Sequence, residues 1–364
     1  SIRKEFSNTV STKHSQKLHH YMGTTSKRSL ISVEQNWKIF EHTSNSVTFT
    51  LYTQKNPNVG QKLRINDKKK LKKSNFDASK PTRFVTHGWQ SDRHSRSCKL
   101  IRKGYDCNVI IVDWSKYSKS LWYLFSTYMV KHRVGENVAR MIDFLYEEGN
   151  LHTKNTTLIG YSLGAHVMGI AGYKTKYKVS YVVGLDPPLL GFLLADSGES
   201  ISKKSGNHVQ IMHTNGGFLG DLSTIGHVDF FPNGGKHQPG CASRKCSHRR
   251  AYELFASSIK TPLKGNQCTS FIKFKAGKYC RMIIFYFILI LSIKVIDQTN
   301  CIFRQTCSNY FFKAETKQSF ITSTVMHSNG REIFLDRIFQ RLRAQILVDI
   351  CPFVVSPDYF EDNR

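Results

Sequence analysis

The chain has 364 residues, a formal net charge of +27 and 40% hydrophobic residues. This length suits one large domain with an appendage, and the apolar fraction is enough for a substantial core. The excess of positive charge favours an anionic partner, such as lipid headgroups or a membrane surface. It does not by itself indicate nucleic acid, because the sequence contains no recognisable nucleic-acid-binding module.

The first half of the chain begins with a polar, basic segment of weak periodicity at residues 1–45. Short strands alternating with polar loops are predicted for residues 47–115. The densest positive run, residues 67–73, is interpreted as a solvated loop, with attraction to an anionic interface as the alternative. Apolar residues recur three and four apart over residues 130–148, which predicts an amphipathic helix that ends at Gly149.

A nucleophile motif follows this helix. A short apolar strand leads into Gly-Tyr-Ser-Leu-Gly at residues 160–164, and a helix rich in small residues is predicted over residues 163–172. This is the strand, sharp turn and helix in which a serine becomes an exposed nucleophile. Gly160 and Gly164 remove the clashes that side chains would make beside Ser162 at such a turn.

A serine nucleophile needs a base, and the base needs an orienting acid. A buried strand at residues 180–185 ends in Asp186, and prolines stop it there. His248 is placed in a loop before an amphipathic helix. An aspartate before proline is usually a turn residue, and a single histidine is usually a surface residue. Their order after Ser162 and their local contexts together favour a catalytic triad.

The same chemistry needs backbone donors for an oxyanion. The N–H of Leu163, directly after the serine, is one candidate. The other is the N–H of Trp89, which follows a predicted strand at residues 82–86 and a glycine that permits close approach, Gly88. A turn with a packing tryptophan is the alternative interpretation of this segment.

The alternation of strand, helix and strand predicts an α/β fold with a mostly parallel sheet. The chain also resembles the pancreatic-lipase family, in particular its short insect-type members. The resemblance is carried by residues 47–57, 80–89, 108–115, 160–172, 184–187, 213–217, 225–235 and 238–255. It implies an α/β-hydrolase fold with helices flanking the sheet, and hydrolysis of carboxylic esters of lipids. It assigns Ser162 as nucleophile, Asp186 as acid and His248 as base, with Leu163 and Trp89 at the oxyanion hole.

The resemblance also implies disulfide bonds. Of nine cysteines, six occupy positions where the family forms such bonds, as the pairs Cys98/Cys107, Cys241/Cys246 and Cys268/Cys280. Disulfides of this kind indicate an oxidising compartment, so a secreted, extracellular protein is expected.

The loop that shields the site in family lipases is short here. Only Ala-Ser-Arg-Lys separates Cys241 from Cys246, which is too little for a hydrophobic flap. An open site of this kind resembles phospholipase A1 enzymes, so the expected substrate is phospholipid, cleaved at sn-1, or acylglycerol. Residues 202–205, in the segment where some members bind calcium, carry no carboxylate. No metal and no cofactor are therefore expected.

The C-terminal third departs from the family pattern. The hydrolase domain is assigned to residues 46–320, with a final strand resembling residues 309–316. The apolar run at 282–293 is shorter than the ~20 residues that span a bilayer. We hypothesise that about 282–307 is a foreign insertion, such as translated intron, with a peripheral helix or strand hairpin as the alternative. The tail, 321–364, is shorter than a β-sandwich domain of ~100 residues, so no colipase partner is expected.

The expected function is that of a secreted serine ester hydrolase acting on lipid at an interface or membrane surface through an acyl-enzyme. The alternative is a non-catalytic lipid-binding or storage protein on the same fold, like the lipase-related yolk proteins of insects. A basic adaptor at a membrane surface is a third interpretation, and it rests on charge alone.

Overall fold

A mixed β-sheet is the frame of the structure. The computed structural model describes residues 46–102, 107–259, 263–267, 281–285 and 309–312. These residues belong to one structural unit, Asn45–Thr316. The predicted segments 1–45 and 321–364 lie outside the described residues.

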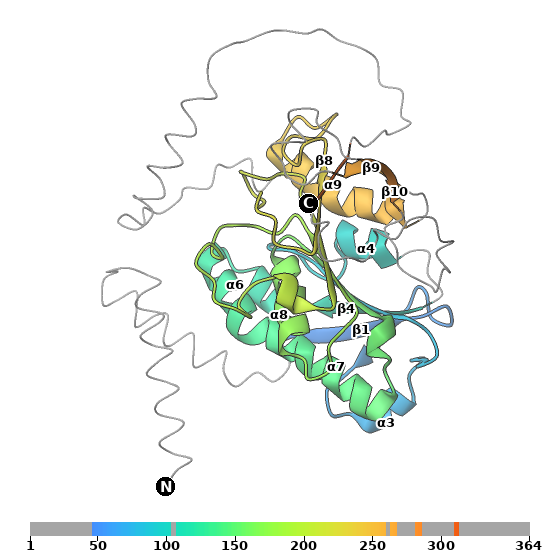
Figure 1. Ribbon diagram of the computed structural model, residues 1–364. Helices are drawn as coiled ribbons and strands as arrows, with labels where there is room; N and C mark the ends of the chain where they lie inside the picture. Colours follow the sequence, from blue (N-terminus) through green and yellow to red (C-terminus); the bar gives the residue numbers. More distant parts are fainter. Residues whose placement is uncertain (1–45, 103–106, 260–262, 268–280, 286–308, 313–364) are drawn as a thin grey trace, which may run out of the picture. The chain divides into compact units, whose positions relative to one another are not determined.

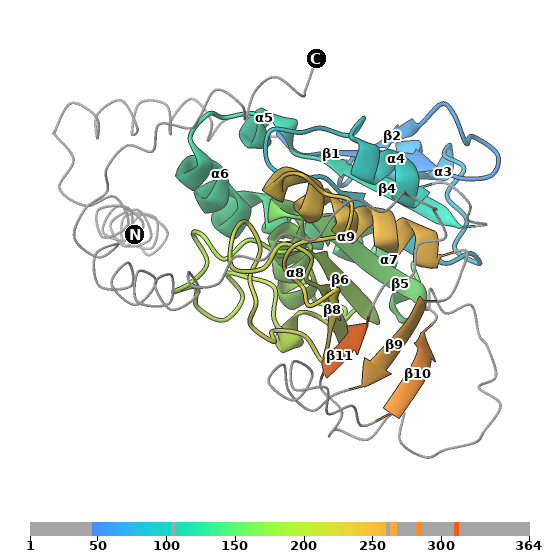
Figure 2. The ribbon, with the colours of Figure 1, turned by 90° about the horizontal axis from the view of Figure 1, so that it is seen from above.

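The described strands form one sheet in the order β10-β9-β11-β8-β7-β6-β5-β3-β4-β1-β2. Figure 2 shows it running from β9, β10 and β11 at one end to β1 and β2 at the other. In the order across the sheet, the seven neighbouring strands β11, β8, β7, β6, β5, β3 and β4 are parallel to one another. The outer strands β1, β2, β9 and β10 pair antiparallel with their neighbours. The strands are β1 (Thr48–Tyr52), β2 (Gln61–Leu63), β3 (Thr82–Thr86), β4 (Asn108–Asp113), β5 (Thr156–Tyr161), β6 (Tyr181–Leu185), β7 (His208–Met212), β8 (Val228–Pro232), β9 (Leu263–Gln267), β10 (Arg281–Phe285) and β11 (Asn309–Phe312).

Helices cover both faces of the parallel part of the sheet, with α4 and α9 on one side and α6, α7 and α8 on the other (Figure 1). The helices are α3 (Lys68–Lys72), α4 (Arg96–Arg102), α5 (Ser115–Ser118), α6 (Tyr123–Met129), α7 (Gly135–Gly149), α8 (Leu163–Lys174) and α9 (Arg244–Ser258). The shorter turns are η1 (Val130–Val134), η2 (Thr153–Asn155) and η3 (Lys203–Ser205). This arrangement is the α/β-hydrolase fold predicted from the sequence.

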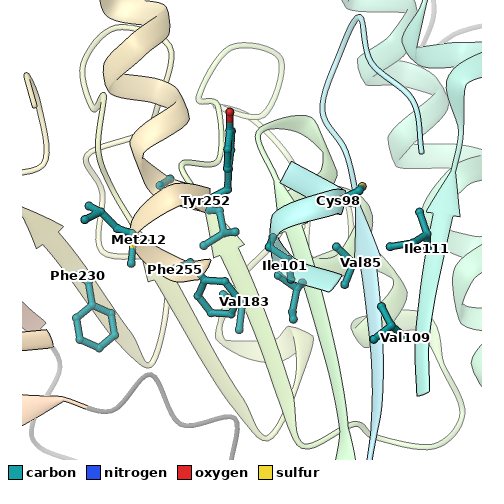
Figure 3. Packing of buried hydrophobic residues seen from close by; sticks show 14 of the residues in the cluster. Val85, Cys98, Ile101, Val109, Ile111, Val183, Met212, Phe230, Tyr252 and Phe255 are labelled. Atoms are coloured by element: carbon teal, nitrogen blue, oxygen red, sulfur yellow. The ribbon is translucent and has the colours of Figure 1, made fainter. Parts of the chain in front are cut away.

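The strand sequences explain why the sheet is covered on both faces. All five residues of β3 and all six of β4 are buried, as continuous burial of parallel strands requires. Figure 3 shows the side under α4 and α9, where Ile101 and Phe255 pack toward Val85 and Val183. Because parallel strands all end at one edge, the loops after β3, β4, β5, β6 and β7 meet there.

The predicted helix at 130–148 divides into two parts. Residues Val130–Val134 form a π-helix, and α7 continues from Gly135. A Cβ at Gly135 would lie 2.5 Å from Ile170 Cγ2, so this glycine lets the chain approach α8 closely. The predicted end of the helix is confirmed. The backbone of Asn150 is in the left-handed conformation, with φ of 53°, and its N–H donates a hydrogen bond to Leu145 O.

The basic run at 67–73 is a helix, so the predicted solvated loop is wrong in this respect. Asp67 caps α3 by accepting the backbone N–H of Lys70 at 2.9 Å. Leu71 packs inward while its charged neighbours stay in contact with solvent. The cap, the buried leucine and an ion pair from Lys68 to Glu148 at 2.7 Å together hold this run of like charges in a helix.

The end of the sheet accounts for part of the C-terminal prediction. Asn309–Phe312 form β11, parallel to β8, at the start of the predicted final strand. Arg281–Phe285 form β10, which pairs antiparallel with β9. Residues 286–308 lie outside the described residues, so the foreign insertion stays a hypothesis. In the described part of the chain, no helix has the length and apolar character needed to cross a membrane.

The packing of α8 predicts an unusual response to alanine. A Cβ at Gly172 would lie 2.0 Å from the backbone oxygen of Ser205. Helix propensity favours alanine over glycine by about 1 kcal/mol, but a clash with fixed backbone costs about 1–3 kcal/mol. Gly172→Ala should therefore lower the urea midpoint of unfolding.

The matched control is Gly149→Ala in α7, where the nearest atoms are side-chain carbons at 3.2 Å and beyond. That variant should keep or raise the midpoint. A Gly172→Ala protein as stable as the Gly149→Ala protein would contradict the packing described for α8.

Candidate active site

Ser162 lies on a strained turn between β5 and α8. Its backbone has φ of 55° and ψ of −127°, a conformation that residues with a side chain seldom adopt. Its N–H donates to Leu185 O at 2.9 Å, which anchors the turn to the end of β6. A Cβ at Gly160 would lie 2.0 Å from Gly164 O, and one at Gly164 would lie 2.4 Å from His87 O. The glycines of the motif are therefore steric requirements of the turn.

Asp186 and His248 form a hydrogen-bonded pair at the same edge of the sheet. The Nδ1–H of His248 donates to Asp186 Oδ2 at 2.5 Å, and both side chains are buried. The other oxygen, Oδ1, accepts the backbone N–H groups of Thr214 at 2.7 Å and Asn215 at 3.0 Å. Because a carboxylate can only accept, Nδ1 carries the proton and Nε2 is left as the basic nitrogen.

The pair lies beside the serine turn. The ring of Tyr161, the residue before Ser162, is 4.8 Å from the ring of His248. Leu185, which anchors Ser162, immediately precedes Asp186. The structure therefore brings the three predicted triad residues to one edge, at the ends of β5 and β6 and on α9.

His248 lies within helix α9, so its predicted position in a loop is wrong. Ser243 caps the helix by accepting the N–H of Cys246 at 3.2 Å, and this starts the helix before the histidine. The predicted disulfide between Cys241 and Cys246 forms, with an S–S distance of 2.04 Å. Ser243 lies between the two bonded cysteines. The disulfide and the Ser243 cap together therefore fix the first turns of α9, which carry His248.

The proposed oxyanion donors flank the serine. A Cβ at Gly88 would lie 2.9 Å from Ser162 Cβ and 3.4 Å from its Oγ, so the loop after β3 touches the nucleophile. Trp89 follows, half-buried, with its indole N–H bonded to Ser120 O at 2.9 Å. Leu163 is the first residue of α8, where a backbone N–H has no acceptor within the helix.

His87 holds this loop in place, a role that sequence reasoning missed. Its Nδ1–H donates to Gly88 O at 2.9 Å, and its own carbonyl accepts the indole N–H of Trp114 at 3.1 Å. Its Nε2 faces Asp113 Oδ1 at 3.2 Å. Burial raises the pKa of Asp113, but the hydrogen bond and charge of His87 and the N–H of Ser115 outweigh it and lower the pKa to about 2. The available signal was the His-Gly pair after one strand and Asp-Trp after the next.

His166 was also missed, and it holds the loop after Asp186. Its Nε2–H donates to Pro188 O at 2.9 Å, and its Nδ1 accepts the N–H of Ile201 at 3.3 Å. The ring stacks on Phe192 at 3.5 Å. Burial, aided by the charge of Lys131, lowers the pKa of His166 to about 3. A neutral histidine thus ties both ends of the 187–201 loop to α8.

Exposed apolar side chains surround this edge of the sheet, and we call them the apolar rim. Tyr123 donates its hydroxyl hydrogen to Leu190 O at 3.1 Å, joining α6 to the 187–201 loop. In that loop, Phe192 is buried while Leu193 and Leu194 are 54% and 79% exposed. The rim consists of Leu121, Trp122, Leu124, Leu190, Leu193, Leu194 and Phe218.

The other predicted disulfides have different outcomes. Cys98 and Cys107 are buried thiols in the core under α4, so the bond predicted between them is wrong for this structure. Burial raises the pKa of the Cys98 thiol to about 12. Cys268 and Cys280 lie outside the described residues. Among the described residues, no three His, Cys, Asp or Glu side chains gather where they could hold a metal ion.

The buried His166 predicts acid sensitivity. In the unfolded chain it takes a proton near pH 6.5, whereas the folded protein keeps it neutral down to about pH 3. Its contribution to stability is therefore present above pH 6.5 and is lost as the pH falls toward 3. Urea unfolding between pH 7 and 4.5 should show a steeper loss of stability for the wild type than for His166→Gln. Parallel pH dependences would contradict the burial of a neutral ring.

The chain is similar in sequence to several lipases and lipase-related proteins. The chain is 35% identical to human lipoprotein lipase over 234 residues, which cover 56% of this chain and 49% of that protein. It is 33% identical to rat pancreatic lipase-related protein 2 over 263 residues, 62% of this chain and 55% of the relative. It is 32% identical over 265 residues to human inactive pancreatic lipase-related protein 1, 63% of this chain and 55% of that protein.

The chain thus spans about half the length of the curated relatives it matches. One of these relatives is named inactive, so the likeness alone does not decide whether this chain has activity. The model of the Lipase family matches residues 9–282, well over half of the sequence. The chain therefore belongs to the Lipase family.

Proposed function

We propose that this protein is a serine hydrolase that cleaves acyl esters of lipids. The observation that carries the proposal is the buried Asp186–His248 pair beside the strained Ser162 turn. A turn of this kind costs free energy, and nucleophile elbows are where such strain recurs. A protein that only bound lipid would have no need of the pair or the strain.

In the proposed reaction His248 acts as the base. Its Nδ1–H is committed to Asp186, so Nε2 takes the proton of Ser162 as the hydroxyl attacks the ester carbonyl. The imidazolium that forms is stabilised by the Asp186 carboxylate and then protonates the leaving alcohol. Water hydrolyses the acyl-enzyme by the same route, and Ser162 regains its proton.

The oxyanion of each tetrahedral intermediate is assigned to the N–H groups of Leu163 and Trp89. Gly88 in contact with Ser162 places the loop within reach of the same carbonyl oxygen. His87 and Trp114 fix the loop, so its donors are oriented before substrate arrives. Pre-oriented donors of this kind are typically worth about 3–4 kcal/mol of barrier each.

The apolar rim supports lipid as the substrate class. The exposure of leucine side chains to water is unfavourable, and their transfer from water to contact with acyl chains is favourable. Only Ala-Ser-Arg-Lys lies within the Cys241–Cys246 bridge, which leaves room for a headgroup. We propose phospholipid, cleaved at sn-1, or acylglycerol as substrate, and an extracellular site of action in keeping with the disulfide.

The first test compares the wild type with Ser162→Ala on a short-chain soluble ester, phosphatidylcholine and triacylglycerol. The mutant should lose turnover on every substrate by a factor of about 10⁴ or more. The ratio of the two lipid rates assigns phospholipase or lipase activity. Circular dichroism establishes that both proteins are folded.

Turnover that survives in Ser162→Ala would disprove the serine mechanism. A folded wild type that binds lipid vesicles but hydrolyses no ester would instead establish the lipid-binding or storage function.

The second test separates the interface from the chemistry. Leu193→Ser combined with Leu194→Ser should lower the rate on phosphatidylcholine vesicles about tenfold or more. The variant lacks two exposed leucine side chains that would become buried against the lipid in the wild type. The rate on the soluble ester should stay within about twofold of the wild type, because neither side chain is assigned to the triad or oxyanion hole.

The matched control is Val59→Ser, which is 78% exposed in the wild type. Tyr52 pairs with Val109 at the start of β4, so the β1–β2 loop that carries Val59 lies at the opposite edge of the sheet from the rim. Equal losses on vesicles and soluble ester in the leucine variant, or a vesicle-specific loss in Val59→Ser, would rule out the rim as the lipid contact.

A further inference from the structure

Another buried histidine–aspartate pair, besides Asp186–His248 and His87–Asp113, lies next to the proposed triad. His213 follows β7, Asp229 lies in β8, and neither side chain has any exposed surface. The Nε2 of His213 is 2.9 Å from Asp229 Oδ1. The carboxylate also accepts backbone N–H groups, from Ile225 at 3.2 Å and from Gly226 at 3.1 Å. The proposed mechanism gives this pair no task.

Both nitrogens of the His213 ring face groups that can only accept. Nδ1 lies 2.7 Å from the backbone oxygen of Asp221, and Nε2 faces the Asp229 carboxylate. A neutral imidazole carries one N–H, so it can satisfy one of these contacts but not both. The geometry therefore favours the doubly protonated, positively charged ring.

The surroundings favour that charge. Burial lowers the pKa of His213, but the hydrogen bond and charge of Asp229, the Asp221 carbonyl and the charge of Asp186 together raise it above its ordinary value. These groups come from β8, from the 213–221 loop and from the end of β6. Phe231 stacks on the ring at 4.4 Å, and it adds no charge.

The same loop holds the acid of the proposed triad. The two residues after His213, Thr214 and Asn215, donate their N–H groups to Asp186 Oδ1. At the far side of the loop, a Cβ at Gly220 would lie 2.5 Å from that oxygen, so the loop backbone packs on the carboxylate. The contact from His213 Nδ1–H to Asp221 O joins the two sides of the loop across its base.

We propose that His213 is a positioning residue: its imidazolium, paired with Asp229, closes the 213–221 loop around Asp186 and so holds the Asp186–His248 pair in its working geometry. This rests on the proposed function, because it assigns a regulator to the same site. It also predicts that the activity depends on the protonation of His213, separately from that of His248.

The sign of the pH effect follows from the raised pKa of His213. The ring is charged and the loop is closed below that pKa. As the pH rises through it, one ring nitrogen loses its proton and a lone pair then faces an oxygen. The loop loses that contact, so kcat should fall on the alkaline side, whereas protonation of the base lowers activity on the acid side.

The test measures kcat and KM from pH 5 to 10 on a soluble ester, for the wild type and Asp229→Asn. Asparagine keeps the size of the side chain and an oxygen for the N–H of Gly226, but it removes the charge that holds the proton on His213. The alkaline limb should move to lower pH by about one unit or more. At pH 8, kcat should fall about tenfold or more with KM little changed.

The control is His227→Gln. His227 accepts the N–H of Val209 at 2.9 Å, near the start of β7 and away from Asp186. The alkaline limb of the kcat profile of this variant should therefore match that of the wild type. An alkaline limb that Asp229→Asn leaves unmoved overturns the proposal, even if kcat falls, since a purely structural pair would lower the rate without shifting the profile.

Ring ¹⁵N shifts of the histidines give a readout that needs no activity. The wild type should contain a buried ring with both nitrogens protonated at pH 7, and Asp229→Asn should lose this signal. The Nδ1–H resonance of His248 should shift in the same variant. If the wild type has no turnover, these spectra still decide the proposal: a singly protonated His213 or an unmoved His248 signal overturns it.

Discussion

The buried carboxylate of Asp186 is the group around which the other parts of the site are arranged. A charge taken out of water must be compensated by hydrogen bonds, and here the donors come from separate elements. His248 approaches from α9, and the N–H groups of Thr214 and Asn215 approach from the loop after β7. The site therefore exists only once the sheet edge and α9 have assembled around this one side chain.

The parallel sheet makes that assembly accessible to sequence reasoning. Ser162 and Asp186 each directly follow a buried strand, and neighbouring parallel strands end at the same edge. A local pattern of apolar strand, special residue and turn is therefore enough to bring them together. The disulfide between Cys241 and Cys246 was expected from the resemblance to the pancreatic-lipase family, and the structure contains it.

The helices that carry His248 and the basic run begin at local caps, Ser243 and Asp67, which the interpretation of both segments as loops overlooked. Features that depend on distant contacts could not be predicted from a local pattern. His166 and His213 are both described by what faces their ring nitrogens, and those partners come from other segments of the chain. Cys98, on α4, and Cys107 are likewise thiols in a core cluster whose other members come from distant segments of the chain.

Histidines recur as supports in this site, and each ring has different hydrogen-bond partners. His166 is held neutral by burial, whereas His213 has acceptors at both nitrogens. His248 has one nitrogen bonded to a carboxylate, which leaves the other available as a base. The proposed roles of these histidines, as a tie, as a charge and as a base, therefore follow from the groups that surround each ring.

Covalent labelling would show whether Ser162 is the activated nucleophile on which the proposed reaction depends. The folded protein would be treated with an alkyl phosphonate ester carrying a nitrophenol leaving group, and the adduct would be located by peptide mass spectrometry. One phosphonate should be attached per chain, on Ser162, and one nitrophenol should be released for each adduct. Unfolded protein should not be labelled. An adduct on another residue, or a folded protein that fails to react, would contradict this role of Ser162.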